Sequence, residues 1–257
     1  MPNFSMRDSE NRHRSIYLLP NAFTTAALFA GFYAVVQAMN DRFEVAAIAI
    51  FVAMVLDGMD GRVARLTNTQ SAFGEQYDSL SDMTSFGVAP ALVMYEWILN
   101  DLGRWGWLAA FVYVAGAALR LARFNTNIAV VDKRYFQGLP SPAAAALVAG
   151  FVWLAVDNKL PIHDSLMAWV AFTLTMYAGI TMVSNAPFFS GKSFALGRSV
   201  PFWGILLVVA VFVFVSSHPP VVLFGLFVLY GLSGWIMWGW RWNKARRLTQ
   251  ERRGHSS

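Results

Sequence analysis

The sequence contains no cysteine and only a small fraction of charged residues. Asp, Glu, Lys and Arg make up 14% of the 257 residues, and 56% of the residues are hydrophobic. Soluble domains carry about 25% charged residues. Without cysteine, the chain forms neither a disulfide framework nor a thiolate metal site, and it has no cysteine nucleophile. The shortage of charge and a mean hydropathy of +0.45 predict that most of the chain lies in lipid.

Long polar stretches are missing as well. Short polar breaks separate the apolar runs and leave no room for a separate globular core, so we expect one membrane domain. The first run continues well past the length of a signal peptide without an evident cleavage site, which favours a retained span. The histidines are scattered, which argues against a histidine-based site. They are His13, His163, His218 and His255.

Apolar segments recur eight times along the chain. They lie at about 18–39, 43–56, 83–99, 105–121, 142–156, 166–183, 200–216 and 221–240. The pattern predicts an all-α protein, a polytopic bundle of about eight transmembrane helices. Several segments are shorter than the approximately 20 residues that a helix needs to cross the hydrocarbon core, so we expect the adjoining polar residues to remain helical.

The basic residues are distributed asymmetrically between the breaks. All but three of the 20 Lys and Arg lie at the termini or in every second break, and the exceptions are Arg42, Arg104 and Lys159. The positive-inside rule therefore predicts a multi-pass protein of the cytoplasmic (inner) membrane with both termini in the cytoplasm. The excess also favours contact with anionic membrane lipids, whereas nucleic acid is not expected because no basic folded module remains outside lipid.

Four aspartates gather between the second and third apolar segments. Asp57 and Asp60 are three residues apart, and Asp78 and Asp82 are four apart, so each pair projects from one face of its helix. Four neighbouring carboxylates repel one another and require a compensating cation. Hard oxygen ligands suit Mg²⁺ or Mn²⁺. The alternative is a solvated loop with incidental acids.

Small and basic residues accompany the acids. Gly61 follows the first pair, and Gly74 precedes Asp78 by one helical turn, so the backbone there carries no side chain that blocks a ligand. Arg65 lies two turns from Asp57 on nearly the same face, where its guanidinium can bind phosphate oxygens. These residues together indicate a site for a metal-bound phosphate or diphosphate.

The segment DGMDGRVAR at 57–65 and, eight residues later, the segment GEQYDSLSD at 74–82 carry a known pattern. Together they resemble the DxxDGxxAR(x8)GxxxDxxxD motif of the CDP-alcohol phosphatidyltransferase family, and every specified position matches. The resemblance implies a six-helix core over 18–183, preceded by a cytoplasmic segment at 1–17. Two additional helices at 184–240 and a basic cytoplasmic tail at 241–257 follow it.

The resemblance also implies roles for individual residues. Asp57, Asp60 and Asp78 would bind the divalent metal, and Asp82 would combine metal proximity with the role of general base. Contacts with the CDP moiety are implied for a further set of residues. These are Gly61, Arg65, Gly74, Ser71 and, in the segment PNAFT at 20–24, Asn21.

Two further segments bear on the acceptor alcohol. ALRLARFN at 118–125 and RYFQGLPSP at 134–142 resemble the branch of the family that uses serine. We therefore expect transfer of the phosphatidyl group of CDP-diacylglycerol to L-serine with release of CMP. Acceptor or phosphate contacts are expected for Arg120, Arg123, Lys133 and Arg134.

Other interpretations stay open at this point. Family members that use glycerol 3-phosphate or inositol phosphate share the acidic motif. An intramembrane prenyltransferase would also use aspartates and Mg²⁺ around a lipid diphosphate, and an ion-coupled transporter could use intramembrane acids as an ion pathway. The oligomeric state is not determined by the sequence, and a homodimer is one of the options.

Overall fold

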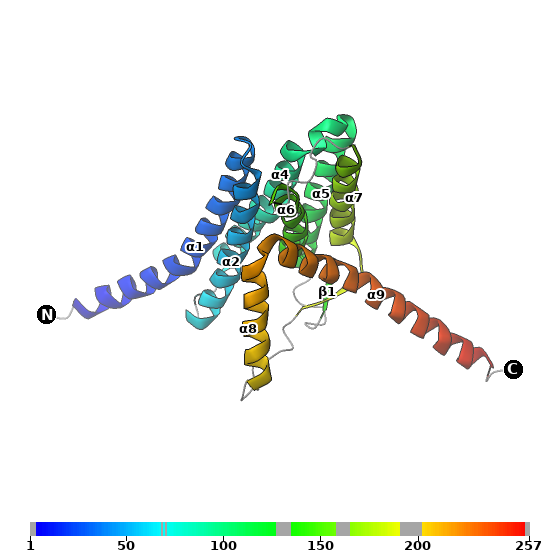
Figure 1. Cartoon of the computed structure of the whole chain (residues 1–257). Helices are drawn as coiled ribbons and strands as arrows, with labels where there is room; N and C mark the ends of the chain where they lie inside the picture. Colours follow the sequence, from blue (N-terminus) through cyan, green and yellow to red (C-terminus); the bar gives the residue numbers. More distant parts are fainter. Residues whose placement is uncertain are drawn as a thin grey trace.

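The computed structural model describes residues 4–67, 69, 71–126, 135–157, 165–190 and 202–254. In these ranges the chain is helical apart from two three-residue strands and short turns (Figure 1). The prediction of an all-α helical bundle is confirmed. Lys133 and Arg134 lie outside the described residues.

Each of the eight predicted apolar segments coincides with helical structure. The helices are α1 (Phe4–Ala38), α2 (Phe43–Thr67), α3 (Ala72–Asp82), α4 (Ala89–Trp97), α5 (Arg104–Thr126), α6 (Ser141–Asp157), α7 (Ser165–Val183), α8 (Phe202–Ser217) and α9 (Pro219–Gly254). A π-helical segment, η1 (Met83–Val88), joins α3 to α4, and a short 3-10 helix, η2 (Leu99–Leu102), precedes α5. The second predicted segment does continue as helix into its polar end, because α2 runs on to Thr67.

Three of the described helices are long and apolar enough to cross a membrane. They are α5, α7 and the part of α9 from Pro219 to Trp242, and α6 is apolar but has 17 residues. These lengths and compositions confirm that the chain is a helical membrane protein.

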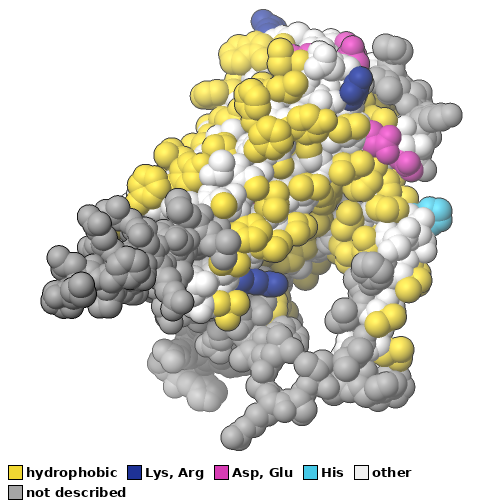
Figure 2. All heavy atoms as spheres, turned by 90° about the vertical axis from the view of Figure 1, so that its left-hand side faces the viewer, with side chains coloured by type: hydrophobic (Ala, Val, Ile, Leu, Met, Phe, Trp, Pro, Cys, Tyr) yellow, Lys and Arg dark blue, Asp and Glu magenta, His cyan; other side chains and the backbone are white. Residues whose placement is uncertain are grey.

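Small side chains fill the interior of the bundle, and many large apolar side chains lie on its outside. Ala34 of α1 and Ala46 of α2 are fully buried, and these two helices pack together, whereas Phe29 and Val55 are 66% and 63% exposed. Figure 2 shows hydrophobic side chains over most of the described surface of one face. This arrangement suits lipid, because helices associate there through close packing of small residues rather than through burial of large apolar ones.

The π-helical segment η1 follows directly after the acidic helix α3. Its residues are held on both sides, since the Ser85 hydroxyl donates to the Ala27 carbonyl of α1 (3.1 Å) and the Tyr113 hydroxyl of α5 donates to the Phe86 carbonyl (3.0 Å). Gly31 of α1 allows this approach, because a Cβ there would collide with Ser85. A π-helical turn shifts the register of a helix. These contacts therefore fix how α3 is rotated relative to α4.

Two short strands, one after α5 and one after α7, pair with each other. β1 (Tyr135–Gln137) pairs antiparallel with β2 (Pro187–Phe189), and Phe136 lies opposite Phe188. Gly138 follows β1 with a φ of +78°, and a Cβ there would collide with a backbone carbonyl of α7. In Figure 1 these strands lie at the lower end of the bundle, toward which the end of α2, the start of α1 and the end of α9 also point.

Candidate active site

Three helices bring the acidic residues together. Asp57 and Asp60 lie near the end of α2, and Asp78 and Asp82 lie on α3, while α1 packs against both helices. Spacings of three and four residues put each pair on one helix face, as predicted. The two faces meet, so the sequence prediction that the acids form one cluster is consistent with the geometry.

Three of the four acids form a compact set of oxygen ligands. One carboxylate oxygen from each of Asp57, Asp60 and Asp78 lies within 4.8 Å of the other two. Asp60 is buried, and its Oδ2 accepts a hydrogen bond from the hydroxyl of Thr24 on α1 (2.8 Å). Carboxylate oxygens at this spacing suit a hard divalent cation such as Mg²⁺ or Mn²⁺.

The electrostatics of the cluster also favour a bound cation. Asp57 and Asp78 lie beyond the apolar parts of their helices, and burial raises the pKa of Asp57 to about 6 and that of Asp78 to about 7. Repulsion between the neighbouring carboxylates adds to the effect of burial. Within the described part of the chain, Asp78 Oδ1 has no hydrogen-bond partner. A cation would relieve both the repulsion and the unsatisfied oxygen.

Asp82 lies beside this set of oxygens, one helical turn after Asp78. It interacts directly with Asp57 and electrostatically with Arg120 of α5. Its Oδ1 is buried and has no hydrogen-bond partner among the described residues. Asp82 therefore connects the three-carboxylate group to the α5 side of the site.

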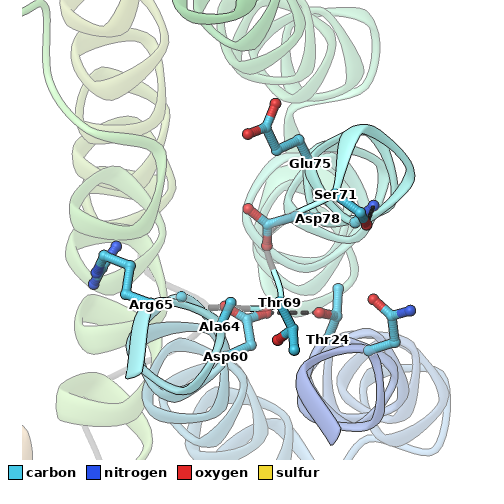
Figure 3. Close-up of a pocket in the computed structure, with 11 residues that line it drawn as sticks. Thr24, Asp60, Ala64, Arg65, Thr69, Ser71, Glu75 and Asp78 are labelled. Carbon is cyan, nitrogen blue, oxygen red and sulfur yellow. Dashed lines mark hydrogen bonds between the residues drawn. The ribbon is translucent and has the colours of Figure 1, made fainter. Parts of the chain in front are cut away.

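A pocket of about 230 Å³ opens next to the cluster (Figure 3). All five residues predicted to contact the CDP moiety line it, together with Asp60 and Asp78. Those five are Asn21, Gly61, Arg65, Ser71 and Gly74. In Figure 3 Arg65 stands on one side of Asp60 and Thr24 on the other. The structure thus brings the predicted nucleotide residues and the predicted metal residues to one place.

The two glycines keep this pocket open. A Cβ on Gly74 would lie 3.2 Å from Ser71 Oγ and 3.6 Å from Asn21 Oδ1, and a Cβ on Gly61 would lie 3.5 Å from Arg65 Nη1. Ser71 is also the N-cap of α3, because its Oγ accepts a hydrogen bond from the Gly74 amide (3.0 Å). The start of α3 is therefore fixed at the wall of the pocket.

The two arginines predicted near the acceptor have different surroundings. Arg120 donates to Ser141 Oγ at the start of α6 (3.0 Å), and its Nε has no partner among the described residues. Arg123 instead donates to the Val183 carbonyl (2.8 Å) and to the Ser184 carbonyl (3.4 Å) at the end of α7. The guanidinium of Arg123 is thus engaged in capping a helix, and that of Arg120 faces Asp82.

Sequence reasoning did not identify Thr24 as a partner of the acidic cluster. Its hydrogen bond to Asp60 joins residues that are 36 positions apart, so no local spacing indicates it. The one signal in the sequence was that Thr24 follows Asn21 by three residues, about one helical turn, and carries a hydroxyl group. Glu75 also lines the pocket, and the acidic pattern alone does not set it apart from the four aspartates.

Comparison with known proteins places these features in a family. Residues 17–182 match the model of the CDP-alcohol phosphatidyltransferase family. A Helicobacter pylori protein named CDP-diacylglycerol–serine O-phosphatidyltransferase is 36% identical over 227 residues, which cover 86% of this chain and 92% of that protein.

Two mycobacterial proteins with the same name are similar over a shorter region. The one from Mycobacterium leprae is 37% identical over 156 residues, 59% of this chain and 52% of that protein. The one from Mycobacterium tuberculosis is 38% identical over 151 residues, 56% of this chain and 51% of that protein. The family model covers more than half of the sequence, and the Helicobacter relative matches nearly all of it. The chain therefore belongs to the CDP-alcohol phosphatidyltransferase family.

Proposed function

We propose that this phosphatidyltransferase transfers the phosphatidyl group of CDP-diacylglycerol to the hydroxyl of L-serine, giving phosphatidylserine and CMP. The observation that carries the proposal is the group of three carboxylates beside a glycine-lined pocket. The names of relatives that are 36% to 38% identical support serine as the acceptor.

The donor fits the pocket by its charge and shape. Its diphosphate would lie against the three carboxylates through the divalent ion, and Arg65 would add a guanidinium for phosphate oxygens. The nucleotide would enter the space beside Gly61 and Gly74, where Asn21 and Ser71 offer polar atoms. The acyl chains would remain among the apolar outer surfaces of the helices.

Asp57, Asp60 and Asp78 would hold Mg²⁺ or Mn²⁺, and Asp82, which interacts with Asp57, would add a fourth carboxylate near the ion. The ion would neutralise the diphosphate and polarise its phosphorus–oxygen bonds. The fit rests on this structure: three oxygens converge, one buried oxygen of Asp78 lacks a partner in the described ranges, and the ligand set contains neither sulfur nor nitrogen.

Asp82 is placed to act as the general base. It would accept the proton of the serine hydroxyl, and the serine oxygen would attack the phosphorus that bears diacylglycerol. The bond from that phosphorus to the oxygen of CMP would break, and CMP would leave. One new phosphorus–oxygen bond replaces one broken bond, and no covalent enzyme intermediate is needed.

Of the two predicted acceptor cations that lie within the described residues, Arg120 is the better placed. It lies near Asp82, and its buried Nε has no hydrogen-bond partner among the described residues, so its guanidinium would bind the serine carboxylate while the hydroxyl reaches the base. The contacts of Arg123 support a role in capping the C-terminus of α7. Lys133 and Arg134 stay predictions for acceptor or phosphate binding.

We further propose that both termini and the active site face the cytoplasm at the inner membrane. The basic asymmetry of the sequence supports this orientation. The start of α1, the end of α9 and the acidic end of α2 also point to the same end of the bundle in Figure 1. Serine and CMP would then exchange with the cytosol. The division into a core at 18–183 and added helices, and assembly as a homodimer, stay predictions.

Turnover of purified protein tests the proposal. CDP-diacylglycerol is supplied with L-serine, glycerol 3-phosphate or inositol phosphate in turn, and CMP and the lipid product are measured with and without a chelator. We expect chelator-sensitive CMP release and phosphatidylserine from serine alone. Preferential product from glycerol 3-phosphate would refute the serine assignment and leave the family chemistry intact. Absence of CMP release with every alcohol would overturn the phosphatidyltransferase assignment itself.

A further inference from the structure

The last helix, α9, lies outside the region that matches the family model, yet it packs against elements of the site. The match ends at residue 182, and α9 begins at Pro219. α9 packs against α6 and against β2. It therefore contacts α6, whose first residue accepts a hydrogen bond from Arg120, and β2, which follows the end of α7.

The contact between α9 and β2 is specific. The hydroxyl of Tyr230 donates to the Phe189 carbonyl (3.0 Å), and the Tyr230 ring lies 5.6 Å from the ring of the fully buried Phe188. Gly234, one turn further along α9, leaves space for the Phe188 ring, because a Cβ there would collide with it. The hydrogen bond from Tyr230 and the close contact at Gly234 thus hold β2 against α9.

This contact continues to Arg120 through the paired strand. β2 holds β1, and Gly138 after β1 donates its amide to the Ala186 carbonyl (2.9 Å). Ser141 follows three residues later as the first residue of α6, and its hydroxyl accepts the hydrogen bond of Arg120. Movement of β2 would therefore shift the hydroxyl that orients the guanidinium.

Tyr230 also lies near Arg120. The phenol of Tyr230 and the carboxylate of Asp82 are both electrostatic neighbours of the Arg120 guanidinium. A guanidinium offers five N–H donors in a fixed plane, so its binding geometry depends on the groups that surround it. Tyr230 brings one such group from a helix beyond the family core.

We infer that α9 orients Arg120 for the acceptor, with Tyr230 as a positioning residue. This inference rests on the proposed function, in which Arg120 binds the carboxylate of the acceptor. Tyr230 touches neither substrate in this account. It fixes β2 and, through β1, the position of Ser141, which accepts the hydrogen bond of Arg120. The donor pocket on α1, α2 and α3 does not depend on it.

Tyr230→Phe in the full-length enzyme tests the inference, because it keeps the ring against Phe188 and removes only the hydroxyl. One lost hydrogen bond corresponds to roughly a three- to tenfold effect. We expect the KM for serine to rise by about that factor, with the KM for CDP-diacylglycerol and kcat nearly unchanged. Restoring Tyr at this position restores the KM.

Tyr177→Phe is the matched control. The Tyr177 hydroxyl donates to the Gly231 carbonyl (2.9 Å), so this variant also removes a tyrosine hydrogen bond to a backbone carbonyl at the surface of α9. Tyr177 does not contact β2 in the described contacts, and we expect a similar change in thermal stability without a change in the KM for serine. Equal kinetic effects of the two variants, or no effect of Tyr230→Phe, would overturn the inference.

If the wild type used glycerol 3-phosphate instead of serine, the proposed function would fail. The same KM comparison with that alcohol would then decide the inference.

Discussion

The pocket for the donor and the surroundings of Arg120 are built from different kinds of sequence. The pocket takes most of its residues from two neighbouring stretches, the end of α2 and the start of α3, with additions from α1. Arg120 instead donates a hydrogen bond to Ser141 from α6 and lies near Asp82 from α3 and Tyr230 from α9. The proposed donor side is therefore encoded locally, whereas the proposed acceptor side depends on how distant helices pack.

This difference suggests how one family changes its acceptor. A local motif keeps the metal and nucleotide chemistry intact as long as α2 and α3 retain their spacing. Residues on α5, α6 and α9 can change independently of that motif, because none of them contributes an oxygen to the three-carboxylate group. Mutations on the two sides should therefore affect different kinetic constants.

The largest effect is expected at the metal group. Asp78→Ala removes one of the three converging carboxylates, so we expect the rate of CMP release to fall by at least about 100-fold, because a proposed ligand of the divalent ion is lost. Asp101→Ala removes an exposed acid from η2 and serves as the control, with activity near that of the wild type. Retention of more than about a tenth of the wild-type rate by Asp78→Ala would contradict the metal assignment.

The next effect separates the two arginines. A charge-assisted hydrogen bond contributes about 1.5 to 3 kcal/mol, so Arg120→Ala should raise the KM for serine by roughly 10- to 100-fold. The KM for CDP-diacylglycerol should change much less. Arg123→Ala should instead lower the melting temperature, since it removes the cap of α7, while the ratio of the two KM values stays constant. The reverse result would exchange the roles of Arg120 and Arg123.

A smaller effect is expected from Thr24. Its hydroxyl holds one oxygen of Asp60, and loss of such an outer hydrogen bond typically costs 10- to 100-fold in metal affinity. Thr24→Val should therefore raise the metal concentration for half-maximal activity by about tenfold, and Thr24→Ser should restore it. An unchanged metal requirement in Thr24→Val would show that the α1 contact is dispensable for the metal.

The smallest effect is expected at the wall of the pocket. Gly74→Ala adds a methyl group 3.2 Å from Ser71 Oγ, so we expect the KM for CDP-diacylglycerol to rise roughly threefold without a change in the KM for serine. Gly58→Ala on α2 is the matched control, because a Cβ there meets no atom within 4 Å among the described residues. Similar kinetics for the two variants would show that the nucleotide does not use this space.

The sequence was sufficient where the pattern is local. The spacing of Asp57 and Asp60 predicts one helix face, and the apolar segments predict the helices, because both depend on the periodicity of a single helix. The prediction that polar residues continue the second helix also follows from the thickness of a membrane. Asn21 lines the pocket together with the other residues predicted to contact the nucleotide, because α1 packs against both acidic helices.

The rest depends on contacts that no local pattern encodes. Arg120 and Arg123 both lie near the end of one helix, and their partners distinguish them: Ser141 at the start of α6 for Arg120, and the C-terminus of α7 for Arg123. The π-helical turn after Asp82 is held by hydrogen bonds to Ala27 and from Tyr113, which lie on other helices and far from it in sequence. Tyr230 was not identified because its partner in β2 is 41 residues away.

The transfer of the serine oxygen to phosphorus is the central claim, and isotope labelling tests it most directly. Wild-type protein is given CDP-diacylglycerol, Mg²⁺ and L-serine that carries ¹⁸O in its hydroxyl group, and both products are analysed by mass spectrometry. The account predicts phosphatidylserine that carries the label and CMP that does not. Label in CMP, or formation of CMP without labelled phosphatidylserine, would contradict it.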